Sequence, residues 1–237
     1  MSSSHNSADN ENPLTCPVGV PNCPVLAEAE RLRLEVAELT EQSRTDTLTG
    51  LANYRSFSEA LGQEIERTQR SDQPTSLIML DIDHFKQVND SWGHEVGNRA
   101  LVHLASLMLQ TVRKLDIPCR YGGEEFAVIL PDTDLAASLP VAERLRQAIA
   151  AHPVPVAGQQ LALTVSLGLS CYTSQEKKTA EELIAEADKY LYQAKERGRN
   201  RTCHPEIKPV DAVSPDERQA LADLFGARAT DKSEHEP

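Results

Sequence analysis

The sequence predicts an α/β fold of the α+β kind, a sandwich of helices and sheet that contains β-hairpins. Three observations support it: segments with helical periodicity, short apolar segments of strand length, and a Gly-Gly pair between two of those strands. Strands and helices do not alternate regularly, which argues against a doubly wound parallel sheet. With 237 residues, 40% of them hydrophobic, the chain can build one ordinary core and carry extensions.

Charge and aromatic content limit the class of partner. The 36 acidic residues outnumber the 24 basic ones, giving a formal net charge of −12, which disfavours nucleic acid and anionic membranes. Aromatic residues make up only 4%, too few for a surface that stacks single-stranded bases. A phosphate ligand stays possible, because it needs only local cations, backbone amides or a metal. We therefore expect no nucleic-acid partner and no membrane partner.

The chain divides by composition into four segments. These are a flexible leader at 1–24, a helical stalk at 25–44, a globular domain at 45–204 and an acidic tail at 205–237. The leader has neither the basic start nor the apolar stretch of a signal peptide, and no apolar run could span a bilayer, which predicts a cytoplasmic protein. Its Cys16 and Cys23 could bind metal or oxidise in a dimer, but they match no ordinary zinc spacing, which favours unremarkable leader cysteines.

The stalk carries a narrow apolar stripe. Val25, Ala29, Leu32, Val36, Leu39 and Ser43 follow a 4-3-4-3-4 spacing. Such spacing is typical of the a and d positions of a short parallel coiled coil. The alternative is an amphipathic helix packed on its own domain, and the narrowness of the stripe favours the coiled coil.

The first half of the globular segment predicts two helices and three strands. Asn53 can cap a helix with apolar residues every four positions, and a buried strand at 76–80 ends in Asp81-Ile82-Asp83. A helix is expected at 98–113. Two further strands, at 117–121 and 124–130, flank the glycine pair, which can supply the positive φ angles of a tight hairpin turn.

The second half predicts two helices and one long strand. We expect a helix at 135–151, a strand at 161–172 kinked at Gly168, and a helix at 180–197 ended by Gly198. In the tail, Ser214-Pro215-Asp216-Glu217 fits a capping box that opens one short helix.

Three charged features carry the candidate chemistry. They are Asp81-Ile82-Asp83 at a strand end, Arg120-Tyr121-Gly122-Gly123-Glu124-Glu125-Phe126 at the hairpin, and Lys195 with Arg199 after the last core helix. Each has an ordinary structural explanation on its own, as a cap, a turn or a helix-dipole partner. Together they suit phosphoryl transfer, because carboxylates hold Mg²⁺, cations neutralise phosphate, and glycines let backbone amides approach it.

Several motifs resemble the GGDEF family in order and spacing across residues 45–204. They are Asp46-Thr47-Leu48-Thr49-Gly50-Leu51-Ala52-Asn53, Asp81-Ile82-Asp83-His84-Phe85-Lys86-Gln87-Val88-Asn89-Asp90, Gly93-His94, Gly122-Gly123-Glu124-Glu125-Phe126, Tyr192-Gln193-Ala194-Lys195 and Gly198-Arg199-Asn200. The resemblance implies a five-stranded sheet flanked by helices, related to the adenylyl-cyclase and polymerase palm. It also implies a diguanylate cyclase, in which two GTP molecules on two chains attack each other's α-phosphates to give cyclic di-GMP. One chain alone should then be inert.

The resemblance assigns roles to the matching residues. Asp81, Glu124 and the Ile82 carbonyl would bind Mg²⁺ or Mn²⁺, Glu124 would help to deprotonate the attacking hydroxyl, and Arg120 would stabilise charge at the reacting phosphate. The residues expected to bind the rest of the nucleotide are Gly122, Gly123, Glu125, Lys195, Arg199 and the backbone amides of His84 and Phe85.

Guanine recognition departs from the family pattern. Asn89 matches the family's base-contacting Asn. Asn98 stands where the family commonly has Asp, and its amide oxygen is a weaker, neutral acceptor. We expect GTP to remain the substrate, with weaker binding.

A further motif, Arg113-Lys114-Leu115-Asp116, matches the family's inhibitory RxxD sequence in position. On its own it is a basic helix end with a polar cap. Arg can fork onto phosphate or a guanine edge and Asp can accept from guanine, which favours a site where the product inhibits. Arg144 is expected to be a secondary contact.

Two other functions compete with the cyclase. A catalytically dead domain could serve as a nucleotide receptor, although Asp81 and Glu124 are both present. Alternatively, the stalk could be the functional surface of an interaction module. The interaction module is compatible with the cyclase, because a homodimer or higher oligomer could be regulated by a protein that binds its stalk.

Overall fold

The computed structural model describes residues 23–42, 44–156, 158–176 and 178–207. Its helices are α1 (Pro24–Gln42), α2 (Tyr54–Ser71), α3 (Phe85–Trp92), α4 (His94–Thr111), α5 (Leu135–Ala151) and α6 (Ala180–Glu196). Its strands are β1 (Thr75–Ile82), β2 (Ile117–Arg120), β3 (Glu125–Leu130), β4 (Val154–Val156), β5 (Gln159–Leu161), β6 (Val165–Tyr172) and β7 (Thr202–Cys203). Among the described residues, no helix is both long and apolar enough to cross a membrane.

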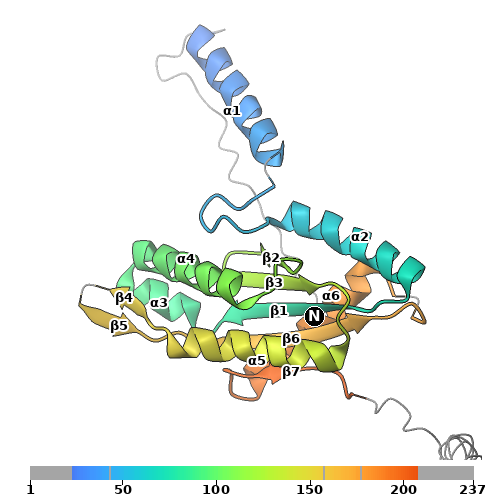
Figure 1. Cartoon of the computed structure of the whole chain (residues 1–237). Helices are drawn as coiled ribbons and strands as arrows, with labels where there is room; N and C mark the ends of the chain where they lie inside the picture. The colour runs from blue at the N-terminus through green and yellow to red at the C-terminus, as the bar shows by residue number, and fades with distance from the viewer. Residues whose placement is uncertain (1–22, 43, 157, 177, 208–237) are drawn as a thin grey trace, which may run out of the picture.

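The expected five-stranded sheet is confirmed, with strand order β2-β3-β1-β6-β7. All neighbouring strands run antiparallel except β6 and β7, which run parallel. Strands β4 and β5 form a separate two-stranded hairpin. This is the mixed α/β architecture that the order of elements predicted (Figure 1).

Helices cover both faces of the sheet. The side chains of β1 alternate between two buried clusters: Ile78 and Leu80 face a cluster shared with α3, α4 and α5, while Leu77 and Met79 face one shared with α2 and α6. Because β1 is buried on both faces, it reads as a continuous apolar run rather than as an alternating one. Asp81 lies near the carboxyl end of β1, where the strand leaves the middle of the core.

The strand expected at 161–172 is wrong as a single element. Residues 159–161 belong to β5 and pair with β4, and β6 begins only at Val165. Gly168 does not kink β6, because it pairs with Met79 within an unbroken ladder. Its role is close approach: a Cβ there would lie 2.1 Å from the Leu191 backbone nitrogen and 2.2 Å from the Ala187 carbonyl oxygen.

Other element boundaries differ less. Helices begin where expected at Asn53, Asp134 and Thr179, whose side chains each cap the first turn. Helix α4 starts four residues earlier than expected, at His94, directly after the left-handed Gly93. Helix α3 and the two-residue β7 were not predicted.

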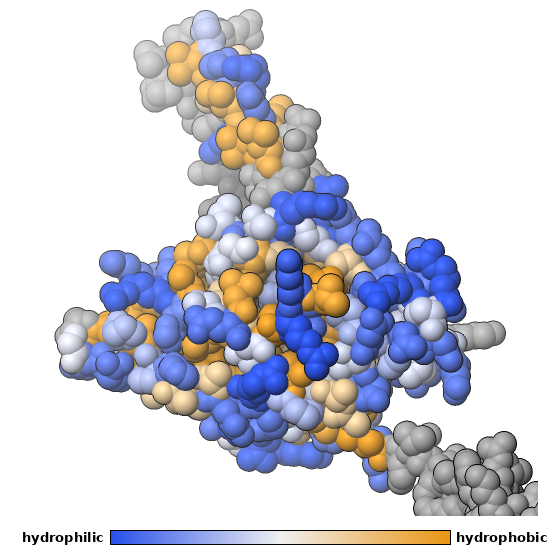
Figure 2. Space-filling view, in the orientation of Figure 1, coloured by the Kyte–Doolittle hydropathy of each residue, from blue (hydrophilic) through white to orange (hydrophobic). Residues whose placement is uncertain are grey.

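Helix α1 extends away from the domain (Figure 1). Its apolar side chains Leu32, Val36 and Leu39 are 47%, 62% and 60% exposed, and Figure 2 shows apolar residues along the helix. The described helix covers most of the predicted stalk, and the coiled coil itself stays a prediction. Residues 1–22, which include Cys16, and residues 208–237, which include the expected capping box, lie outside the described residues.

Candidate active site

Three elements bring charged side chains together at one end of β1. Asp81 is the penultimate residue of β1 and is only 6% exposed. The Lys195 ammonium, on the last turn of α6, lies 2.8 Å from Oδ2 of Asp81. Glu124 comes from the turn before β3, where its carbonyl accepts a hydrogen bond from the Ile82 amide at 3.4 Å. The sheet register sets this meeting, because Asp81 pairs with Glu125 across β1 and β3.

The electrostatics of this cluster favour an added cation. Burial raises the pKa of Asp81, as do the charges of Glu125 and Asp83, while Lys195 acts in the opposite direction. Burial and then the charge of Asp81 raise the pKa of Glu124. A raised carboxyl pKa means that the negative form is unfavourable in its surroundings, so a positive ligand would stabilise it.

Two carboxylates suit a metal that arrives with a nucleotide. The described part of the chain contains no group of three or more His, Cys, Asp or Glu side chains that could hold a metal ion. Magnesium, however, is often bound by one or two carboxylates and completes its shell with substrate phosphates and water. Asp81 and Glu124 supply that number, and Ile82 adjoins both, because it follows Asp81 in the chain and donates its amide to the Glu124 carbonyl.

The glycine pair shapes the hairpin in a way that was not expected. Neither Gly122 nor Gly123 has a positive φ, so the predicted left-handed turn is wrong. At Gly122 a Cβ would lie 2.6 Å from Oε2 of Glu125, the end of a flexible side chain that would have to move aside. The amides of Tyr121 and Gly122 both donate to the Glu125 carbonyl, at 2.9 and 3.1 Å. The Glu125 side chain is therefore folded back over the turn.

Arg120 lies under the hairpin. Its Nη2 donates to the Gly123 carbonyl at 2.7 Å, and its Nη1 contacts both oxygens of Asp46 at 3.2 Å. Burial acts to raise the pKa of Asp46, but hydrogen bonds from Thr49 and the nearby Arg120 outweigh it and lower the pKa. Arg120 thus ties the catalytic turn to the loop before α2. Sequence reasoning did not single out Asp46 for this contact.

Two of the predicted phosphate-binding segments directly follow elements that carry the charged cluster: His84 and Phe85 come after β1, and Arg199 comes after α6. Arg199 lies in the exposed turn after α6, with φ of 61°. His84 is left-handed, with φ of 57°, and helix α3 begins immediately after it at Phe85. The first amides of a helix have no partner within it, so this helix start can receive an anion.

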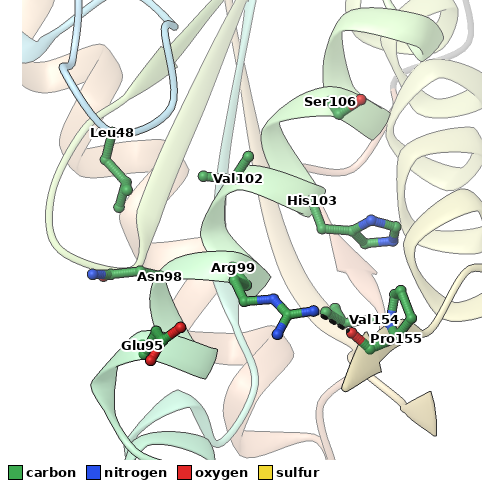
Figure 3. A pocket seen from close by; sticks show the side chains of 9 residues that line it. All are labelled: Leu48, Glu95, Asn98, Arg99, Val102, His103, Ser106, Val154 and Pro155. Carbon is green, nitrogen blue, oxygen red and sulfur yellow. Dashed lines mark hydrogen bonds between the residues drawn. The ribbon is translucent and has the colours of Figure 1, made fainter. Parts of the chain in front are cut away.

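The predicted base-binding residues lie at the junction of α3 and α4. Asn89 packs directly on Gly97, where a Cβ would come 1.9 Å from its Oδ1. The next residue, Asn98, lines a groove of about 500 Å³ together with Leu48 and Val102. In Figure 3, Asn98 points toward Leu48, while Arg99 bonds to the Pro155 carbonyl. Asp81 and Glu124 do not line this groove.

The residues of the predicted inhibitory site lie at the other end of α4. Asp116 accepts a hydrogen bond from the Arg113 amide at 2.7 Å, and Arg144 donates to the Thr111 carbonyl at 2.8 Å. Both arginine side chains are exposed, whereas Asp116 is buried. The contact between Arg113 and Asp116 is a local cap made by the backbone of Arg113, and it leaves the side chain of Arg113 exposed.

Comparison with known proteins gives a consistent family. Residues 43–201 match the family described as diguanylate cyclase, GGDEF domain. The chain is 43% identical over 171 residues to the response regulator PleD of Caulobacter vibrioides, covering 71% of this chain and 37% of PleD. It is 40% identical over 174 residues to the diguanylate cyclase DgcP of Pseudomonas aeruginosa, covering 73% of this chain and 26% of DgcP. The chain therefore spans well under half the length of these curated relatives.

Solved structures are similar over the same region. The diguanylate cyclase SiaD of Pseudomonas aeruginosa, solved in complex with its activator SiaC, has a TM-score of 0.66 and 38% identity, covering 76% of this chain and 70% of SiaD. The coiled coil and GGDEF domain of DgcB from Caulobacter crescentus, solved with c-di-GMP, has a TM-score of 0.65 and 31% identity, covering 76% of this chain and 95% of that one.

Proposed function

This chain belongs to the GGDEF family of diguanylate cyclases, and from that premise we propose that it joins two GTP molecules into cyclic di-GMP and releases two pyrophosphates. The observation that carries the proposal is the convergence of Asp81, Glu124 and Lys195 from three separate elements. Phosphoryl transfer depends mainly on positioning and on stabilising negative charge, and this cluster offers both.

The residues would have three roles: they would hold the metal, remove a proton and bind the phosphates. Asp81, Glu124 and the Ile82 carbonyl would hold Mg²⁺ or Mn²⁺, which would neutralise charge on the phosphates. Glu124 would help to remove the proton from the attacking 3′-hydroxyl, and a raised pKa suits a group that must take up a proton. Lys195 and Arg199 would hold the outer phosphates, with the amides at His84 and Phe85.

The remaining contacts would orient the nucleotide. Asn89 and Asn98 would bind guanine from the junction of α3 and α4, and Glu125 with the Gly122-Gly123 turn would lie beside the phosphates. We propose that Arg120 acts by fixing that turn through the Gly123 carbonyl, as well as adding positive charge near the reacting phosphate.

The reaction requires two copies of the chain. Each domain would present one GTP, so the active form is a homodimer or a higher oligomer. Arg113, Asp116 and Arg144 would bind the product away from the metal and inhibit the enzyme. A regulatory protein could bind α1, an idea supported by the similarity to a cyclase solved with its activator.

Purified protein should convert GTP to cyclic di-GMP in the presence of Mg²⁺ or Mn²⁺. Asp81→Ala and Glu124→Ala should each lower the rate about 100-fold or more, because each removes a metal-binding carboxylate. Glu66→Ala, which removes the same charge from the exposed face of α2, is the matched control and should leave the rate unchanged. Chromatography of the nucleotide products measures all four proteins.

Two results would count against this proposal. Full activity of Glu124→Ala would remove the assigned role of that residue. Tight binding of cyclic di-GMP by a wild-type protein that never produces it would instead indicate a nucleotide receptor.

A further inference from the structure

The turn after helix α6 has an unusual backbone. Three consecutive residues, Gly198, Arg199 and Asn200, have φ angles of 105°, 61° and 44°. Residues other than glycine rarely adopt this left-handed region, and they persist in it only where their surroundings hold them. The turn includes Arg199, whose guanidinium is exposed and has no ion-pair partner among the described residues. The backbone beneath it therefore fixes the point at which this side chain leaves the turn.

The group that holds this turn is the buried carboxylate of Asp83. Its Oδ2 accepts hydrogen bonds from the Asn200 amide at 3.0 Å and from the Thr164 hydroxyl at 2.7 Å. Its Oδ1 accepts from the Ser166 hydroxyl at 2.6 Å. Three neutral protein donors thus occupy both oxygens of Asp83. The Asp81 carboxylate instead contacts the charged Lys195 through Oδ2. The two aspartates of the Asp81-Ile82-Asp83 motif therefore do different work.

A second support holds Asn200 from the opposite side. Arg146 of α5 donates to Oδ1 of Asn200 at 2.8 Å and to Glu143 at 3.0 Å. Glu143 in turn accepts from the Thr202 hydroxyl at 2.7 Å. The strained residue is thus fixed between the end of β1 and helix α5.

We propose that Asp83 is a positioning residue, which acts through the Asn200 amide to aim Arg199 at the outer phosphates of the nucleotide. The inference rests on the proposed function, since it assumes that Arg199 binds phosphate. A charge-assisted hydrogen bond to a backbone amide is among the stronger ones, and a carboxylate at this place stabilises a backbone conformation that the chain otherwise avoids. Asp83 itself touches neither metal nor nucleotide in this scheme.

The test is a double-mutant cycle between Asp83 and Arg199. Asp83→Ala should raise the KM for GTP and the dissociation constant of a non-hydrolysable GTP analogue about 10- to 100-fold, with a smaller effect on kcat. Asp83→Asn should change KM less, because its amide can donate to the Ser166 hydroxyl and keep its oxygen toward Asn200. In an Arg199→Ala background, Asp83→Ala should add little, because the two residues act in series.

A spectroscopic readout keeps this inference separate from catalysis. The Asn200 amide proton resonance should move upfield in Asp83→Ala, as its hydrogen bond to a charged acceptor is lost. Ser166→Ala, which removes a donor from the other oxygen, should leave that resonance nearly unchanged. Asp83→Asn serves if the alanine variant does not fold.

Three results would overturn the inference. An unmoved Asn200 resonance would show that Asp83 does not hold the turn. An equal loss of affinity in the wild-type and Arg199→Ala backgrounds would show that Asp83 acts on something else. A loss of kcat in Asp83→Asn with unchanged KM and altered metal dependence would make Asp83 a metal ligand. If wild type neither binds the analogue nor makes cyclic di-GMP, the proposed function fails, while the resonance shift still reports on Asp83.

Discussion

At Gly168 the backbones of β6 and α6 are in close contact, and a methyl group at this position would interfere with that contact. Gly168→Ala would place its Cβ against backbone atoms of α6, which cannot move aside as a flexible side chain could. We expect the free energy of unfolding to fall by at least about 1–3 kcal/mol, the usual cost of overpacking. Urea denaturation monitored by circular dichroism measures this change.

Gly62 provides the matched control for that substitution. It lies within α2, and a Cβ there would meet nothing within 4 Å. Gly62→Ala should raise the free energy of unfolding by about 0.5–1 kcal/mol, because alanine favours the helix. If the two variants were equally stable, the close approach at Gly168 would not matter energetically.

The sequence indicated individual residues where chemistry limits the choice. Carboxylates and cations in three separate motifs pointed to Asp81, Glu124 and Lys195, and the structure places them together. It could not indicate the clamp between Asp46 and Arg120, because these residues are 74 positions apart and nothing within either motif shows that the two meet. The positions of Gly122 and Asp83 likewise depend on contacts that only folding creates.

The bounds of helices and strands could be predicted where a local feature of the sequence marks them. Helices α2, α5 and α6 have capping side chains at their own N-termini, so their starts could be predicted closely. The alternation of Leu161, Leu163, Val165 and Leu167 runs on without a break, and such a pattern cannot show that its two ends pair with different strands. Helix α3 and strand β7 are too short to give a periodic signal.

Helix α1 is the element where control of activity can be tested. The seam from Val25 to Ser43 offers fewer than three heptads, and isolated helices of about 12–15 residues are marginal in water. Leu32→Asp combined with Leu39→Asp should therefore sharply reduce turnover at low protein concentration. Higher concentration should partly restore it, because the catalytic residues are intact and pairing is a matter of effective concentration. Measuring the specific rate over a dilution series tests this.

Leu34 offers a control on the same helix. It lies outside the a and d stripe and is 72% exposed, so Leu34→Asp should leave the dilution curve unchanged. A double variant that matched wild type at every concentration would show that α1 does not control pairing. A weak stalk would also explain how a protein that grips α1 could activate the enzyme.

Across the whole molecule, helix α4 separates the proposed guanine-binding residues from the proposed inhibitory site. Asn98 is near its start and Thr111 ends it, a distance of about 20 Å at 1.5 Å per residue. Arg113→Ala should therefore leave the initial rate largely intact and weaken inhibition by added cyclic di-GMP about tenfold or more. Initial rates measured over a range of added product give the inhibition constants.

The comparison of Arg113→Ala with wild type also decides whether the Arg113 to Asp116 motif is an inhibitory product site or a local helix cap. Identical inhibition curves for Arg113→Ala and wild type would mean that Arg113 and Asp116 form only the local cap observed at the end of α4. Arg144→Ala is expected to give a smaller change, because that side chain already donates to the Thr111 carbonyl.

The two borders of the sheet affect how copies of this protein can associate. Strand β7 has only two residues, and the outer side of β2 is bonded to Ala52, whose amide and carbonyl contact Pro118 and Arg120. Exposed strand edges are where β proteins add foreign strands and begin to form fibrils. Neither of the two border strands, β2 with four residues and β7 with two, offers a long row of free amides and carbonyls within the described residues. A protein that we propose acts as a pair can thus be concentrated in solution with little risk of strand-by-strand polymerisation through these two strands.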